Sequence, residues 1–169
     1  MKMTSQTLKQ IQAPLKQKYA ENPASALVTL KACSRIGEGI SCRVETGRAL
    51  VEAGLHPATG GDGLSACSGD MLLEALVACA GVTLKAVAVA IGVDLRDAVI
   101  SAEGDLDFRG TLAVDKQTPV GFQKIRLNFV LQTEATPEQI ATLIKLTERY
   151  CVVYQTLARP SVITTTCRR

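Results

Sequence analysis

The chain has few of the residues that proteins use to bind nucleic acids or metal ions. Its 169 residues include no Trp, three Tyr and three Phe, so aromatic residues make up 4% of it. Base stacking depends on such side chains, and a net charge of +3 is too small and too scattered for a nucleic-acid surface. The chain also has one histidine, His56, and no Cys-x-x-Cys pair, whereas zinc sites usually show closely spaced ligands. We therefore expect neither a nucleic-acid partner nor a native metal.

The N-terminus lacks the apolar segment of a secretory signal peptide, because residues 1–6 read Met-Lys-Met-Thr-Ser-Gln. We therefore expect a cytoplasmic, reducing location. In that setting cysteines are expected to be thiols rather than a disulfide framework. The six cysteines are Cys33, Cys42, Cys67, Cys79, Cys151 and Cys167. We expect Cys33, Cys42 and Cys167 to be structural, and we leave the role of Cys67 open.

The length of the chain is that of one domain. Residues 5–20 carry apolar side chains at helical spacing, with Pro14 placed to kink or split the helix. We expect residues 1–24 to form a helical extension and residues 25–169 to form the core of a single domain.

The longest apolar run covers residues 71–93 and contains Cys79. Its 23 residues are long enough to cross a bilayer. The two charges within it, Glu74 and Lys85, fall on one face of a helix, and a narrow polar stripe fits a buried core helix better than lipid. We predict a long core helix and rank a membrane span last.

Alternating apolar and polar residues predict strands in the rest of the chain. Residues 100–108 and 125–131 alternate with period two, as strands with one wet face do. Residues 26–51 predict further strands, including one at 48–51, and residues 162–166 predict the last strand. The order of helices and strands predicts an α+β fold with mainly antiparallel pairing.

A second helix is predicted from Thr136-Pro137-Glu138-Gln139, in which Thr136 caps the helix and Gln139 holds the capping-box position. Helical spacing then places Cys151 on the buried stripe of this helix or just past its end. The glycine-rich residues 54–63 predict a surface loop, in which we expect His56 to be exposed to solvent and not catalytic.

Two segments with a cysteine resemble a known family. The first reads Asp-Met-Leu-Leu-Glu-Ala-Leu-Val-Ala-Cys at residues 70–79 and follows the glycine-rich loop. The second reads Tyr-Cys-Val-Val-Tyr-Gln-Thr-Leu at residues 150–157. In order and separation the two are similar to the signatures of the OsmC/Ohr family, the osmotically inducible protein C and organic hydroperoxide resistance proteins. The chain differs in having Gly69-Asp70 in place of Pro-Glu and Val152 in place of proline after the second cysteine.

The resemblance implies a fold, a partner and an activity. The fold would have antiparallel sheets around a long central helix, and two copies would form an intertwined homodimer. The activity would be a thiol-dependent peroxidase in oxidative-stress defence, with organic hydroperoxides as substrates and no cofactor. By this resemblance Cys79 is the peroxidatic thiol, Cys151 resolves its sulfenic acid, and a dithiol such as a dihydrolipoyl protein is the reductant. Cys67 is an alternative redox partner.

Attack on a peroxide requires the thiolate, and burial alone would raise the pKa of Cys79. Cys79 also lies too far along its own helix for the helix dipole to help, so we expect a cation to approach it from elsewhere. The resemblance implies an arginine from an early hairpin, oriented by an acid near the start of the central helix. The candidates are Arg35 as the nearest match, with Arg43 and Arg48 as alternatives, and Asp70, with Glu74 as the alternative.

A pocket with apolar residues such as Leu72, Leu76 and Val82 would favour alkyl hydroperoxides over hydrogen peroxide. The alternative hypothesis is a non-enzymatic dimer of the same fold, which binds an apolar small molecule or a partner in a cleft between its subunits.

Overall fold

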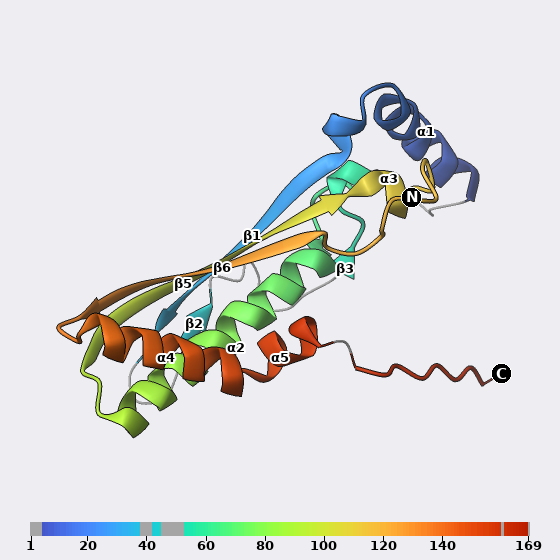
Figure 1. Cartoon of the computed structure of the whole chain (residues 1–169). Helices are drawn as coiled ribbons and strands as arrows, with labels where there is room; N and C mark the ends of the chain where they lie inside the picture. Colours follow the sequence, from blue (N-terminus) through green and yellow to red (C-terminus); the bar gives the residue numbers. More distant parts are fainter. Residues whose placement is uncertain (1–4, 38–41, 45–52, 160, 169) are drawn as a thin grey trace.

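A four-stranded antiparallel sheet is covered on one face by helices in the structure, a computed structural model that describes residues 5–37, 42–44, 53–159 and 161–168 (Figure 1). The strand order is β2-β1-β5-β6. The strands are β1 (Leu27–Ile36), β2 (Cys42–Val44), β5 (Leu95–Asp107) and β6 (Lys124–Thr133). Two short strands, β3 (Ala53–Gly54) and β4 (Ala66–Cys67), form a separate parallel pair.

The helices lie mostly on one side of this sheet (Figure 1). They are α1 (Ser5–Glu21), α2 (Ser68–Ile91), α3 (Phe108–Thr111), α4 (Pro137–Tyr150) and α5 (Val152–Ala158), with 3₁₀ turns η1 (Pro23–Ala26) and η2 (Pro57–Thr59). The prediction of an α+β fold with antiparallel strands and a long central helix is confirmed. The predicted capping box is also present, because α4 starts with reciprocal hydrogen bonds between Thr136 and Gln139. The long helix α2 ends at Gly92, which has the left-handed conformation (φ 72°).

The core forms where α2 lies on the sheet. Its buried residues recur every three or four positions and face β1, β5 and α4: Leu73, Leu76, Val77, Ala80, Gly81, Leu84, Val87 and Ala88. Ser34 on β1 donates a hydrogen bond of 3.0 Å to the carbonyl of Val77 and ties strand to helix. In the part of the chain that the structure describes, α2 is the one helix long and apolar enough to cross a membrane. Its packing in the core accounts for that composition without a lipid environment.

The N-terminal helix packs at one end of the molecule, beside α3 (Figure 1). Tyr19 is buried and its hydroxyl donates to the carbonyl of Ala58 at 2.8 Å, while Gln12 donates to the carbonyl of Thr59 at 3.1 Å. Both hydrogen bonds join α1 to the η2 turn. Pro14 lies inside α1, which continues through it, so the expected split of this helix is wrong.

The predicted last strand is also wrong for this chain. Residues 161–168 have no regular secondary structure and extend away from the helices (Figure 1). Val162 and Ile163 are 94% and 87% exposed. Their β-branched side chains favour a strand, but a strand forms only where a neighbouring strand pairs with it. The predicted strand at 48–51 lies outside the described residues.

Charged side chains pair across the outer face of the sheet. Arg126 forms ion pairs with Asp105 and Glu103, and Thr29 donates to Asp105 at 2.8 Å. Hydrogen bonds from Arg126 and then Thr29 lower the pKa of Asp105 from 3.8 to about 2. Because the folded-state pKa lies below the ordinary value, Asp105 stabilises the fold above about pH 4, and this contribution is lost as the pH falls towards 2.

We therefore expect Arg126→Met to lower the melting temperature at pH 6 and to approach wild type near pH 2. Melting curves of both proteins from pH 2 to pH 7 measure this difference. Arg96→Met is the control, because the ion pairs of Arg96 among the described residues are with exposed carboxylates, Asp94 and Glu134, and the change should affect stability less. If the difference in melting temperature between wild type and Arg126→Met stays constant with pH, Arg126 stabilises the fold through packing and not through its ion pairs.

Candidate functional site

The fold brings together two cysteines that lie 72 residues apart in sequence. Cys79 lies at the middle of α2, and Cys151 is the single residue between α4 and α5. Because α2 packs against both α4 and α5, the two side chains meet and interact directly. Cys151 is 1% exposed and Cys79 is half-buried, and both are free thiols.

The surroundings of Cys79 favour its thiolate. Burial raises the pKa of the Cys79 thiol, but hydrogen bonds outweigh this and leave the pKa below its usual value of 9.0. The interacting groups are, in order of effect, the backbone of Val153, the Cys151 side chain, the backbone of Val152 and the Thr83 side chain. Val152 and Val153 open α5, where backbone N–H groups have no partner within the helix. Their free donors stabilise the negative sulfur.

The surroundings of Cys151 have the opposite effect. Burial raises the pKa of Cys151 to about 11, although the N–H of Tyr154 donates to its sulfur at 3.4 Å and favours the thiolate. The interaction with Cys79 raises the pKa of Cys151 further. At neutral pH Cys79 is therefore the better nucleophile, while Cys151 keeps its proton.

Thr83 lies one helical turn after Cys79 and offers a direct test of this arrangement. We expect Thr83→Val to raise the pKa of Cys79, because the valine keeps the shape of the side chain and removes the hydroxyl. The rate of alkylation of Cys79 as a function of pH, followed by mass spectrometry, measures the shift. Thr142→Val is the control, since the Thr142 hydroxyl is on the exposed side of α4 and donates to the carbonyl of Glu138 at 2.9 Å. Identical pH profiles of Cys79 alkylation in Thr83→Val and wild type would show that the Thr83 hydroxyl does not affect the pKa of Cys79.

These donors differ from the cation that the sequence led us to expect. The argument that the dipole of α2 is too distant holds, because Cys79 lies eleven residues after the first residue of that helix. A second helix, α5, supplies the donors instead. The sequence holds one hint of these donors, the start of a helix immediately after Cys151. Hydrophobic spacing alone does not show that this helix start lies beside Cys79.

Arg35 does not meet Cys79 within this chain. Its neighbours on β1, Ser34 and Ile36, are buried on the side of α2, so Arg35 points to the opposite face of the sheet. There its side chain is 65% exposed and its Nε lies 3.5 Å from Asp97. The Arg43 side chain and all of Arg48 lie outside the described residues.

The candidate acids near the start of α2 also lie apart from Cys79. Asp70 precedes Cys79 by nine residues and Glu74 by five, which correspond to about 13.5 and 7.5 Å of helical rise. Burial raises the pKa of Asp70, and nearby His56 acts in the opposite direction. Cys67, at the N-cap of α2, precedes Cys79 by twelve residues or about 18 Å of rise. That separation rules out a disulfide between Cys67 and Cys79 within one chain. The prediction that Cys67 is an alternative redox partner is therefore wrong for Cys79 of the same chain.

His56 is half-buried, whereas the sequence predicted an exposed side chain. Its Nδ1 accepts a hydrogen bond of 3.0 Å from the N–H of Ala58, and its ring stacks on Phe108 with centroids 5.1 Å apart. The correction follows from α1, which holds the η2 turn against α3 in a way that local sequence does not show.

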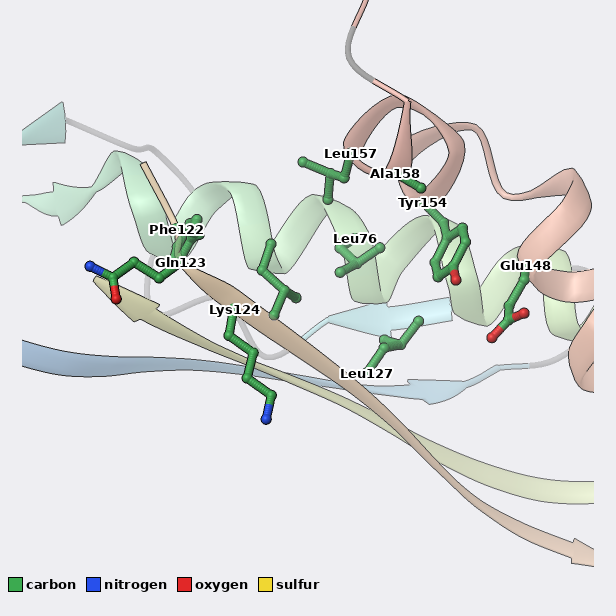
Figure 2. Close-up of a pocket in the computed structure, with 10 residues that line it drawn as sticks. Leu76, Phe122, Gln123, Lys124, Leu127, Glu148, Tyr154, Leu157 and Ala158 are labelled. Carbon is green, nitrogen blue, oxygen red and sulfur yellow. The ribbon is translucent and has the colours of Figure 1, made fainter. Parts of the chain in front are cut away.

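A cavity of about 470 Å³ lies between α2, β6 and α5 (Figure 2). Figure 2 shows Leu76 from α2, Leu127 from β6, and Tyr154 and Leu157 from α5 around it. Leu76 lies three residues before Cys79 and Tyr154 three residues after Cys151, so each cysteine has a neighbour one turn away in the wall of this cavity. Gln123, Lys124 and Glu148 add polar groups to a lining of leucine, isoleucine and aromatic side chains, and we call it the apolar cavity.

The predicted apolar pocket is thus only partly present. Leu76 lines the apolar cavity, but Leu72 lines another cavity near the start of α2, and Val82 is exposed on the surface of α2. Among the residues described, no group of three or more His, Cys, Asp or Glu side chains is placed to hold a metal ion.

Comparison with known proteins gives a family and a fold. The family model described as OsmC-like protein matches residues 60–166. A crystal structure of an OsmC-like hydroperoxide resistance protein from Jannaschia sp. CCS1 superimposes with a TM-score of 0.60 at 15% identity, over 85% of this chain and 95% of that one. At this identity the similarity shows the fold alone. No curated protein sequence matches the chain.

Proposed function

Because the chain belongs to the OsmC-like protein family, we propose that it is a thiol-dependent peroxidase that reduces organic hydroperoxides. The observation that carries the proposal is the direct interaction of Cys79 with Cys151, in which hydrogen bonds lower the pKa of one thiol and burial raises the pKa of the other to about 11. The similar protein from Jannaschia is described as a hydroperoxide resistance protein, which agrees with this activity.

The proposed reaction has two steps. The Cys79 thiolate attacks the terminal oxygen of the hydroperoxide, the O–O bond breaks, and the alkoxide takes a proton to leave as an alcohol. Cys79 is then a sulfenic acid. The Cys151 sulfur attacks the Cys79 sulfur, the proton of Cys151 leaves with the hydroxyl as water, and a disulfide forms. A dithiol reductant, such as a dihydrolipoyl protein, would reduce the disulfide back to two thiols. The cytoplasmic location is a prediction from the sequence.

The apolar cavity supports alkyl hydroperoxides as substrates. Its leucine side chains can bury the apolar part of such a substrate, and Leu76 lies about one turn before Cys79 on α2, whereas hydrogen peroxide has no apolar part to bury. The same cavity favours the second candidate function, a binding protein for an apolar small molecule that uses no thiol chemistry.

We further propose a homodimer. Met71, Val82 and Val89 are exposed on α2, and separations of 11 and 7 residues return each to within about 20° of one face. An apolar stripe on the outer side of a core helix is stabilised when a second copy covers it. Since Arg35 and Asp70 do not reach Cys79 within one chain, a catalytic role for either requires the second subunit.

Free thiols counted before and after one equivalent of cumene hydroperoxide test the activity. We expect the reduced protein to lose two of its six thiols, and peptide mapping to find Cys79 joined to Cys151. The product, cumyl alcohol, should form in equal amount. An unchanged thiol count would reject the peroxidase and leave the binding protein, which equilibrium binding of an apolar dye to the reduced protein would then test.

A further inference from the structure

A second, open cavity of about 680 Å³ lies on the surface of α4 and α5, and its charge is strongly one-sided. Three basic residues line it: Lys145 and Arg149, one turn apart on α4, and Arg159, just after α5. Glu148 is the one acidic residue in its lining, so the lining has an excess of two positive charges. We call it the basic groove.

The three basic side chains are exposed, and within the described part of the chain none of them forms an ion pair with a carboxylate. Arg149 instead lies over the ring of Tyr150 at 5.6 Å. Lys145 and Arg149, at positions i and i+4, are like charges that repel each other, and Glu148 is the one carboxylate beside them in the groove. The arrangement is complementary to a negatively charged partner.

The basic groove is continuous with the apolar cavity. Glu148, Tyr154 and Ala158 line both. Tyr154 also donates its backbone N–H to the sulfur of Cys151. A molecule bound in the groove therefore lies next to the apolar cavity and beside Tyr154, whose N–H contacts the sulfur of Cys151.

We propose that the basic groove is the docking surface for an anionic electron donor, a dithiol carried next to carboxylates, that reduces the Cys79–Cys151 disulfide. The proposal rests on the peroxidase function proposed above. The donor gives two electrons and two protons: its dithiol becomes a disulfide, and Cys79 and Cys151 return to thiols. The groove suits the donor better than the hydroperoxide, because the hydroperoxide needs the apolar cavity and the groove is polar and lies outside it.

Two dithiols that differ only in charge test the proposal: dihydrolipoate, which has a carboxylate, and dihydrolipoamide, which is neutral. Protein oxidised with one equivalent of cumene hydroperoxide is mixed with each, and acid quenching with alkylation and mass spectrometry gives the reduction rate. We expect dihydrolipoate to react about tenfold faster than dihydrolipoamide at about 20 mM salt, and at nearly the same rate at about 500 mM salt.

The triple variant Lys145→Gln, Arg149→Gln, Arg159→Gln should lose this preference while its rate with dihydrolipoamide stays unchanged, which also shows that the variant folds. The control replaces Lys16, Lys18 and Lys116, three exposed residues outside both cavities, with Gln. It removes the same net charge and should keep the preference.

Three results would overturn the proposal. If no disulfide forms, the peroxidase function fails and the docking surface fails with it. If the disulfide forms but wild type shows no preference, or the groove variant keeps the preference, only the docking surface fails. If the groove variant instead slows oxidation by linoleate hydroperoxide and not by cumene hydroperoxide, the groove binds a carboxylate-bearing substrate rather than the donor.

Discussion

Cys79→Ser is expected to abolish the reaction with cumene hydroperoxide, with a fall in rate of roughly a thousandfold or more. A serine hydroxyl remains protonated at neutral pH, so the hydrogen bonds that favour the Cys79 thiolate have no anion to stabilise. Neither thiol loss nor cumyl alcohol should be detected. The measurement is the initial rate of hydroperoxide loss at pH 7 with an excess of dithiothreitol.

Cys151→Ser is the matched variant, because it removes the resolving sulfur and keeps Cys79. The first step should still occur, so Cys79 should accumulate as a sulfenic acid that dimedone traps and that excess peroxide converts to sulfinic acid. Equal loss of activity in both variants, with no sulfenic acid in Cys151→Ser, would mean that the pair matters to the fold. Retained activity in Cys79→Ser would place the chemistry at another cysteine.

The periodic elements of the fold could be predicted from the sequence because their signals are local. Alternation over residues 125–131 marks β6, and the Thr136 capping box marks the start of α4. One failure concerns contacts with residues far away in the chain, and the other concerns a local helix signal. The strand expected at 162–166 has no partner strand in the part of the chain that the structure describes. The split expected at Pro14 does not occur, because α1 continues through this residue.

The sequence predicted which two cysteines would lie close together, but it did not predict the groups that lower the pKa of Cys79. Resemblance to a family identified Cys79 and Cys151, and the structure brings the two together. The hydrogen-bond donors are largely backbone groups of Val152 and Val153, which any residue other than proline supplies, so no residue pattern reveals them. Only the packing of α5 against α2 does so.

The side of α2 that faces away from the core is exposed to solvent within one chain. A mutation on this side is therefore predicted to have a second large effect, on dimerisation. Val82 and Val89 are 38% and 63% exposed on a helix whose other side lies in the core. If a second copy covers this stripe, Val82→Asp places a carboxylate in an apolar interface without a partner. Such a charge costs about 3 kcal/mol or more, which corresponds to a dissociation constant raised more than a hundredfold.

We expect wild type to sediment at twice the mass of one chain at micromolar concentration and Val82→Asp to sediment as a monomer. Val130→Asp is the control, because Val130 is also an exposed valine but lies on β6, away from α2, and this variant should remain dimeric.

The monomeric variant also tests which subunit lowers the pKa of Cys79, because Cys79 lies three residues before Val82. An unchanged pH profile of Cys79 alkylation in the monomer means that α5 alone activates the thiol, whereas a midpoint raised towards 9 means that the second subunit contributes. A monomeric wild type would contradict the dimer, and with it any part for Arg35 or Asp70 in the reaction.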